Sequence, residues 1–192
     1  MKLHLGCGHH LLDGWVNVDN DPGLPNQDGI KIMDVTGDFD FPDNTFDFVF
    51  SEHVIEHMTW SQGLNMLRES HRVLRSGGTL RVATPNINFL VELLREPDRN
   101  NDYLEWATKE FLPDAPYVSS CMVVNNFVRD WGHLFIYDGK TLHTSLKAAG
   151  FRRAYVQDLS VSQFEELRGL ENVGRMPSDY LDRETMVMEA IK

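Results

Sequence analysis

Two short apolar runs near the N-terminus each end on residues that suit the binding of a ribose. The first run ends at the turn Gly6-Cys7-Gly8, and the second, Val16-Asn17-Val18, ends at Asp19. If these runs are neighbouring parallel strands, both ends lie at one edge of a sheet, where open α/β sheets bind nucleotides. The glycines let backbone N–H groups approach a ligand closely, and the carboxylate of Asp19 can accept hydrogen bonds from both ribose hydroxyls.

Apolar runs and helical spacings alternate along the chain, which is typical of a parallel sheet with right-handed crossovers. A helix is expected to begin after Thr59, because Thr59 and Gln62 fit a capping box, and Gly77 is its expected C-cap. The first crossover, 9–13, has room for little more than one helical turn. The expected strands are 2–7, 15–19, 30–33, 46–50, 79–83, 153–157 and 185–191, and the other expected helices are 85–95, 102–111, 140–149 and 162–170.

Two segments between these elements lack a regular pattern. Residues 20–29, rich in Pro, Gly, Asn and Asp, are expected to form a loop. Residues 112–130 are long for a structureless loop in a compact domain, which usually indicates a lid or a binding loop. We therefore expect a single domain over 1–192, in which 86–133 is an insertion that forms a substrate pocket or a lid.

The size, charge and cysteines of the chain exclude several classes of function. Its 192 residues suit one domain with a substantial core. The net charge of −11 argues against a nucleic-acid partner and against anionic membrane surfaces. No apolar run approaches the roughly 20 residues of a spanning helix, and a strand at the very start leaves no room for a secretory signal. With only Cys7 and Cys121, the first in the glycine turn, we expect a cytoplasmic protein with reduced thiols.

Taken together, several segments resemble the class I S-adenosylmethionine (SAM) dependent methyltransferases. The matching segments are 3–8, Asp19, Asp34-Val35, 46–58 and 73–80, the last with the pattern V-L-R-S-G-G-x-L. The resemblance implies an α/β, doubly wound, Rossmann-like three-layer sandwich, whose mostly parallel seven-stranded sheet has an antiparallel last strand. The chain departs from the family at His10, which stands where a third glycine is usual, and in its abbreviated first crossover.

The resemblance also implies which residues hold SAM. Asp19 would accept from the ribose hydroxyls, Asp34 would accept from the adenine amino group, and the Val35 amide would donate to the adenine ring. Each carboxylate alone could be a solvated loop residue and the glycines a plain tight turn, but their positions after three successive strands favour a cofactor site. The implied cofactor-binding residues are Leu5, Gly6, Cys7, Gly8, Asp19, Asp34, Val35, Ser51 and Glu52.

His53 follows the fourth expected strand, next to the expected position of the reactive sulfur. Methyl transfer is an in-line displacement, so alignment of the acceptor supplies much of the rate. A hydroxyl or amine acceptor also benefits from a general base, and the ordinary pKa of histidine suits that role. His53 is therefore the candidate catalytic residue. The alternative is a histidine that only packs or hydrogen-bonds at the edge of the cofactor.

His53, Glu56 and His57 have the i, i+3, i+4 spacing that places side chains on one helical face. Such groups could hold a divalent metal. The stretch is similar to the Glu-x-x-Glu-His of some O-methyltransferases that act on catechols of the ubiquinone pathway and of some small-RNA methyltransferases, although His53 replaces the first glutamate. Short matches often arise by chance. Glu56 and His57 are expected instead to cap and brace a turn, so we predict no metal cofactor.

Three residues are candidates for contact with the methyl acceptor: His57, Trp131 and His133. The alternative for Trp131-Gly132-His133 is a packed tryptophan within a polar turn. A second set of aromatic residues has the spacing of a helix and is expected to form its core face: Tyr103, Trp106 and Phe111.

These observations predict a SAM-dependent methyltransferase that acts on a small-molecule acceptor, such as a polar metabolite. A first alternative is a SAM-binding or S-adenosylhomocysteine-binding module or subunit without turnover, which the short first crossover makes credible. A second alternative is a nicotinamide-dependent oxidoreductase, which shares the strand, glycine turn and acid arrangement. The missing third glycine argues against the dinucleotide fingerprint of that class. The acceptor atom and the oligomeric state stay open at this point.

Overall fold

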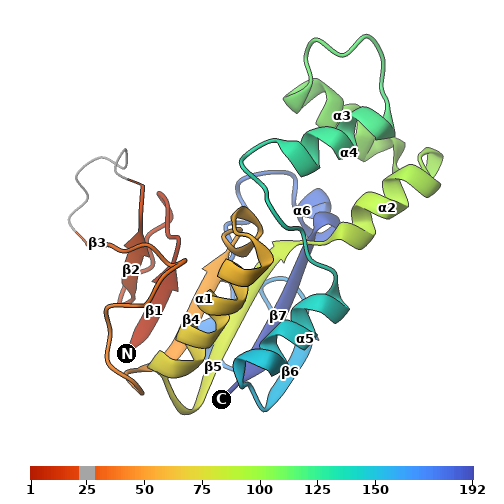
Figure 1. Ribbon diagram of the computed structural model, residues 1–192. Helices are drawn as coiled ribbons and strands as arrows, with labels where there is room; N and C mark the ends of the chain where they lie inside the picture. The colour runs from red at the N-terminus through yellow and green to blue at the C-terminus, as the bar shows by residue number, and fades with distance from the viewer. Residues whose placement is uncertain (22–28) are drawn as a thin grey trace.

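Among residues 1–21 and 29–192, which a computed structural model describes, seven strands form one sheet in the order β3-β2-β1-β4-β5-β7-β6 (Figure 1). Strands β1 to β5 pair in parallel, and β7 is antiparallel to both of its neighbours. This confirms the expected Rossmann-like α/β fold. The expected loop at 20–29 lies mostly outside the described residues. The strands are β1 (Lys2–Leu5), β2 (Val16–Asp19), β3 (Ile30–Ile32), β4 (Phe46–Glu52), β5 (Leu74–Pro85), β6 (Arg153–Gln157) and β7 (Thr185–Ile191).

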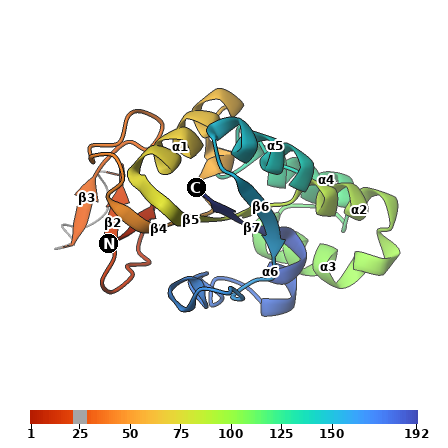
Figure 2. The ribbon, with the colours of Figure 1, turned by 90° about the horizontal axis from the view of Figure 1, so that it is seen from below.

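Helices α1 (Trp60–Val73) and α5 (Gly139–Ala149) pack side by side on one face of the sheet (Figure 2). The expected capping box of α1 is present, with Thr59 and Gln62 bonded reciprocally. The expected end at Gly77 is wrong. The helix ends at Val73, because Leu74 is already extended and pairs with Phe46 at the start of β5.

The opposite face of the sheet is covered without a long helix. The irregular segment 158–177 crosses it, and its only regular element is one 3₁₀ turn over Glu165–Leu167. The helix expected over 162–170 is therefore wrong. Leu167 and Leu170 pack on Phe50 of β4 and on Trp15 of the short first crossover. The segment thus occupies the surface that an abbreviated first crossover leaves uncovered.

A buried cation fastens this segment to the sheet. Arg81 on β5 is fully buried and forms ion pairs with Glu171 at 2.6 Å and with Glu189 of β7 at 2.8 Å. Its guanidinium also donates to the carbonyl oxygens of Val161 and Asp158. Because an unpaired buried charge costs several kcal/mol, this network ties the segment to the centre of the sheet.

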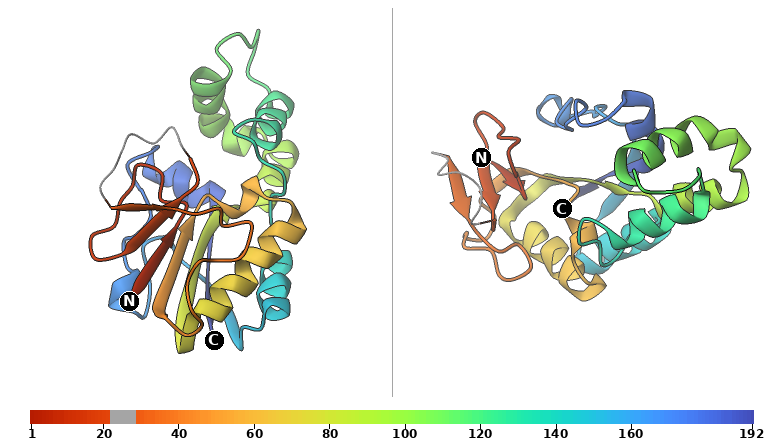
Figure 3. Two further views of the ribbon diagram at one scale, coloured as in Figure 1. Left: turned by 60° about the vertical axis from the view of Figure 1, so that its left-hand side comes forward. Right: turned by 90° about the horizontal axis from the view of Figure 1, so that it is seen from above.

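Three further helices stand beyond the C-terminal ends of β4 and β5 (Figures 1 and 3). They are α2 (Ile87–Arg95), α3 (Asn101–Phe111) and α4 (Ser120–Arg129), and they share a small core of their own. The expectation of an irregular 112–130 is partly wrong, because Ser119 caps α4 with its hydroxyl. A short helix that the sequence did not indicate, α6 (Ser178–Glu184), leads into β7. No helix of the described ranges is long and apolar enough to cross a membrane.

Candidate active site

The glycine turn and the carboxylate after β2 meet at one edge of the sheet. Gly6 and Gly8 both have positive φ, at 63° and 49°. The N–H of Gly8 donates to Asp19 Oδ2 at 2.8 Å. A Cβ on Gly6 would lie 2.2 Å from Val54 Cγ2, so this position has no room for a side chain, whereas a Cβ on Gly8 would meet no atom within 4 Å. The turn therefore places the Gly8 backbone against the Asp19 carboxylate, with free space on the side where a Cβ of residue 8 would stand.

A cavity of about 470 Å³, here called the edge cavity, lies between these strand ends. Its size is within the range of small-molecule sites. Asp34 is exposed, and its Oδ1 accepts from the N–H and the hydroxyl of Thr36 at 2.9 and 2.8 Å. The side chain of Val35 is buried. The lining residues include Gly6, Asp19, Met33, Asp34, Val35, Val54 and Met58.

Five of the residues expected at the cofactor, Gly8 among them, are not among the residues that line the edge cavity. Leu5 and Ser51 are fully buried and are not among the residues that line the edge cavity. Cys7 is buried as well, and its burial raises the pKa of the thiol to about 11, which keeps it protonated at neutral pH. Both oxygens of Glu52 accept from the backbone N–H of Asn172 at 3.1 and 3.0 Å. Of these five residues, Cys7 and Glu52 line a neighbouring space beside the glycine turn.

A smaller space of about 160 Å³, here called the turn hollow, opens beside the glycine turn. It is lined by Gly6, Cys7 and Glu52 on the sheet side and by Asn172 and Arg175 from segment 158–177. No sequence pattern indicated Arg175, which stands in a polar stretch far from the glycine turn along the chain. The structure therefore adds a cation to this end of the site.

Hydrogen bonds of the buried residues His4 and Asn17 hold the short first crossover in its conformation. His4 is buried, and its Nδ1 lies 3.1 Å from Asn17 Oδ1. The Asn17 amide also accepts from the N–H of Leu12 and donates to the carbonyls of Leu12 and Trp15. Burial lowers the pKa of His4 to about 4, so its ring is neutral at physiological pH. This network was not predicted from the sequence.

A third space of about 260 Å³, here called the aromatic pocket, lies between the sheet and the helices α3 and α4. The expected acceptor residues His57, Trp131 and His133 all line it. Tyr103 lines it too, although its ring also packs in the core of the α2–α4 group, as expected. Its hydroxyl donates to Glu184 at 2.8 Å. The other lining residues include Phe111, Phe127, Arg175, Met176 and Glu184.

His53 stands where the three spaces meet, because it lines the edge cavity, the turn hollow and the aromatic pocket. Its φ of 51° is unusual for a residue with a side chain. Its Nδ1 lies 3.0 Å from Glu56 Oε1, and its Nε2 accepts from the guanidinium of Arg175. Both ring nitrogens therefore have partners on opposite sides.

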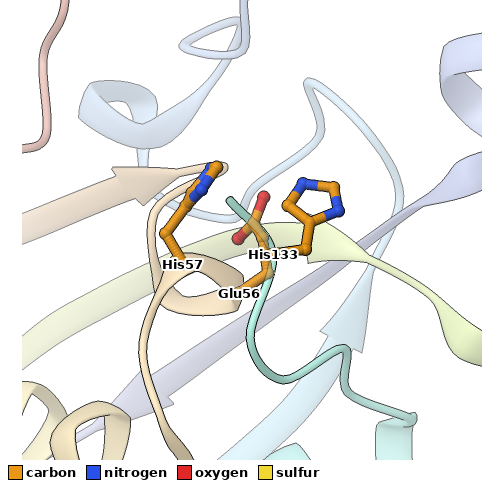
Figure 4. Close-up of side chains that lie close together, drawn as sticks. All are labelled: Glu56, His57 and His133. Atoms are coloured by element: carbon orange, nitrogen blue, oxygen red, sulfur yellow. The ribbon is translucent and has the colours of Figure 1, made fainter. Parts of the chain in front are cut away.

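Glu56, His57 and His133 form a cluster in the wall of the aromatic pocket (Figure 4). One side-chain ligand atom from each of the three lies within 4.8 Å of the others. His133 Nδ1 lies 2.6 Å from the carbonyl oxygen of Phe127. The Glu56 carbonyl accepts from the N–H groups of Leu134 and Phe135, so backbone bonds join the two segments. Among the described residues His53 is not part of this cluster, and His133 takes its place beside Glu56 and His57.

Glu56 carries a buried charge. Its side chain is fully buried, and Thr84 Oγ1 donates to its Oε2 at 3.1 Å. Burial alone would disfavour the charged form, but the hydrogen bond and the charge of His53 hold the pKa of this carboxyl below its usual value. Glu184 differs, because its burial raises its pKa despite the hydrogen bond from Tyr103. The pocket therefore holds two buried carboxyls with opposite pKa shifts.

Comparisons with known proteins match part of the sequence to a family profile and the fold to several solved structures. Residues 17–82 match the sequence profile described as a methyltransferase domain. The whole chain superimposes on a SAM-dependent methyltransferase from Thermotoga maritima (TM-score 0.57, 16% identity, 81% of that chain covered). It also superimposes on a SAM-dependent methyltransferase from Mesorhizobium loti (TM-score 0.57, 14% identity, 90% of that chain covered). A third match is phosphoethanolamine N-methyltransferase 2 from Haemonchus contortus (TM-score 0.56, 14% identity, 48% of that chain covered). No curated protein matches the sequence.

Proposed function

We propose that this chain, of which residues 17–82 match a methyltransferase domain, is a class I SAM-dependent methyltransferase that methylates a small molecule bound in the aromatic pocket. The observation that carries the proposal is the position of His53, which lines both the edge cavity and the aromatic pocket. A methyl group can pass directly from one ligand to the other only where two such spaces meet. The pocket, at about 260 Å³, suits an acceptor of metabolite size.

The residues of the edge cavity fit the adenosyl part of SAM. Asp19 and Asp34 both line the cavity, and their carboxylates suit ribose hydroxyls and an adenine amino group. Gly6 lines the cavity beside them, and the N–H of Gly8 holds Asp19 Oδ2 in place at 2.8 Å. When bound, SAM supplies an electrophilic methyl group on a sulfonium. The chain itself has to bind the acceptor, exclude water and accept a proton.

In this proposal His53 accepts that proton. Glu56 Oε1 lies 3.0 Å from His53 Nδ1, so a turn of the imidazole ring would let the Nδ1–H donate to the carboxylate while Nε2 keeps its lone pair. Arg175 now donates to that nitrogen, so this contact has to open before Nε2 can take a proton from an acceptor O–H or N–H. In the transfer the acceptor atom would bond to the methyl carbon as the carbon–sulfur bond breaks, and the proton of the acceptor would move to His53 Nε2.

The cofactor assignment is tested by calorimetric titration of S-adenosylhomocysteine. Asp19→Asn keeps an oxygen for the N–H of Gly8 but loses the second carboxylate oxygen, so we expect at least about tenfold weaker binding, the loss of one charge-assisted hydrogen bond. Asp13→Asn, a change at an exposed residue of the first crossover, is the matched control and should bind normally. Equal affinities for both variants would contradict the role of Asp19.

Turnover is tested by incubation with methyl-labelled SAM and a pool of polar metabolites. A methyltransferase labels a product, whereas a binding module takes up the cofactor and transfers nothing. His53→Asn suits the positive φ at this position and should slow transfer by about 10²-fold or more, as expected for loss of a general base. Unchanged transfer in this variant would limit His53 to a packing role.

A second candidate, a metal-assisted transfer, is favoured by the cluster of Glu56, His57 and His133. One carboxylate and two imidazoles are a donor set typical of divalent transition metals. The Phe127 carbonyl beside His133 Nδ1 would fix the tautomer that leaves Nε2 free for a metal. An ion held there would lie in the wall of the pocket and could bind an acceptor oxygen.

The metal candidate is tested with Co²⁺, whose visible absorption reports its ligands directly. We expect a Co²⁺ spectrum with nitrogen ligands for the native chain and its loss in His133→Gln. His143→Gln on the exposed side of α5 is the matched control. A spectrum that His133→Gln leaves unchanged, or the lack of any bound Co²⁺ in the native chain, would reject a metal at this cluster.

A further inference from the structure

The turn hollow has the charges that the amino-acid end of SAM requires. That end carries a carboxylate and an ammonium group on one carbon, so its site needs a fixed cation and a fixed carboxylate. We propose that Arg175 binds the carboxylate and that Glu52 binds the ammonium. This rests on the proposed function, and it assigns part of the cofactor site to segment 158–177, which lies far along the chain from the glycine turn.

The turn hollow lies in the right place for this role. It shares Gly6 and His53 with the edge cavity, so a ligand can extend from one space into the other past the glycine turn. Its volume of about 160 Å³ is smaller than that of the edge cavity. An adenosyl group in the edge cavity would therefore leave its short amino-acid chain to enter the turn hollow.

Charge makes Arg175 the natural partner for a carboxylate here. Among the described residues it is the only Lys or Arg that lines the edge cavity, the turn hollow or the aromatic pocket. Residues 22–28 contain neither Lys nor Arg. The edge cavity presents acidic side chains, Asp19 and Asp34 among them, and these would repel a carboxylate. Binding of a zwitterion in this orientation therefore depends on one guanidinium.

The present contacts leave Arg175 able to take a further ligand. Its guanidinium donates to His53 Nε2, and a longer contact of 3.5 Å reaches Glu184 Oε1. A guanidinium has five N–H donors, so these contacts do not exhaust it. Glu52 accepts one backbone N–H, that of Asn172, and a carboxylate has acceptor sites left after such a bond. The bond also fixes Glu52 against the segment that carries Arg175.

The packing of the fold explains why a distant segment would supply this cation. Segment 158–177 covers the sheet face beside the short first crossover, where Phe164, Leu167 and Leu170 pack with Leu12 and Trp15. The buried ion pair of Arg81 with Glu171 fixes the segment one residue before Asn172. Arg175 is therefore presented to the glycine turn by a segment anchored in the core.

The test compares two ligands that differ only at the amino-acid end. S-adenosylhomocysteine has that end, whereas 5′-methylthioadenosine keeps the adenosyl group and the sulfur but lacks it. We expect Arg175→Gln to weaken S-adenosylhomocysteine by about 10- to 100-fold, the range for a charge-assisted hydrogen bond, and to leave 5′-methylthioadenosine within about twofold. Arg175→Lys should recover part of the loss, and Glu52→Gln should show the same selectivity for S-adenosylhomocysteine.

Arg168→Gln is the matched control. Arg168 belongs to the same segment, and its guanidinium donates to the carbonyls of Ser162 and Gln163. It lines none of the three spaces, so its substitution should leave both affinities unchanged.

Three results would overturn the assignment. They are unchanged binding of S-adenosylhomocysteine by Arg175→Gln, an equal loss for both ligands, and a loss confined to the KM of an anionic acceptor. The last result would mean that Arg175 binds the methyl acceptor and not the cofactor. A native chain that binds neither ligand would instead refute the proposed function itself.

Discussion

The edge cavity and the aromatic pocket both reach His53, but the chain builds them in different ways. The edge cavity uses residues that directly follow β1, β2 and β3, and they converge because parallel strands end at one edge. The aromatic pocket takes its wall from α3, α4, the turn before α5, and α6. Its residues are brought together by packing between distant segments. A site of the first kind depends on local backbone geometry, and one of the second kind depends on long-range contacts.

The largest effect is expected when the buried ion pair that holds segment 158–177 on the sheet is removed, because that segment is a long-range contact. Arg81→Met removes the buried cation between Glu171 and Glu189 and leaves their carboxylates without a partner. We expect the free energy of unfolding to fall by about 3–5 kcal/mol, measured by urea denaturation. Arg153→Met, at an exposed residue of an edge strand, should change it by less than about 0.5 kcal/mol. Similar stability of the two variants would show that the segment is held by its apolar contacts alone.

The local geometry of the edge cavity is tested at Gly6. Gly6→Ala would combine a positive φ with a Cβ 2.2 Å from Val54 Cγ2. We expect a loss of about 2–4 kcal/mol in stability and weaker binding of S-adenosylhomocysteine. Gly14→Ala has a similar positive φ but no atom within 4 Å of the new Cβ, so it should cost only about 1–2 kcal/mol. An equal loss of stability in both variants would mean that the Val54 side chain moves aside, and that its contact with residue 6 does not require a glycine there.

The short first crossover gives a pH dependence that belongs to the glycine-turn side of the site, because His4 lines the turn hollow and not the aromatic pocket. The pKa of His4 is about 4 in the folded chain and 6.5 in the unfolded chain, so the unfolded state binds more protons between these values. Stability therefore falls as the pH drops from 6.5 towards 4, by about 3 kcal/mol in total from this group.

His4→Gln, which cannot titrate but can still donate to Asn17, is the matching variant. Its stability should fall less steeply over this range in urea titrations at stepped pH. A slope equal to that of the native chain would mean that His4 is protonated in the folded state without penalty.

The smallest expected effect separates the two sites by function. Trp131 lines the aromatic pocket, is 44% exposed and does not line the edge cavity. Trp131→Ala should slow methyl transfer to the accepting metabolite by about tenfold, since one face of the pocket is lost. Its affinity for S-adenosylhomocysteine should stay within about twofold. A parallel loss of cofactor affinity would show that the two spaces are coupled more tightly than their linings suggest.

Local signals in the chain predicted most of the sheet and the edge cavity. The capping box of Thr59 and Gln62 set the start of α1, and Gly150, with a φ of 111°, ends α5 as expected. Errors fell where long-range pairing overrode a local signal. Gly77 suits a helix end, but pairing of Leu74 with Phe46 began β5 earlier. The apolar spacing of 162–170 resembled that of a helix, but its apolar side chains pack on the sheet from an irregular segment.

The amino-acid sequence alone determined the placement of Gly6, Gly8 and Asp19, because the direction and pairing of neighbouring strands follow from short apolar runs and their turns. Only the tertiary structure decided that Arg175, Glu184 and His133 lie around His53 and Glu56. These residues are separated by long stretches of sequence, and their approach depends on how β7, segment 158–177 and the α2–α4 group pack. No local pattern encodes those contacts, because each is the outcome of burying surfaces that only the folded chain brings together.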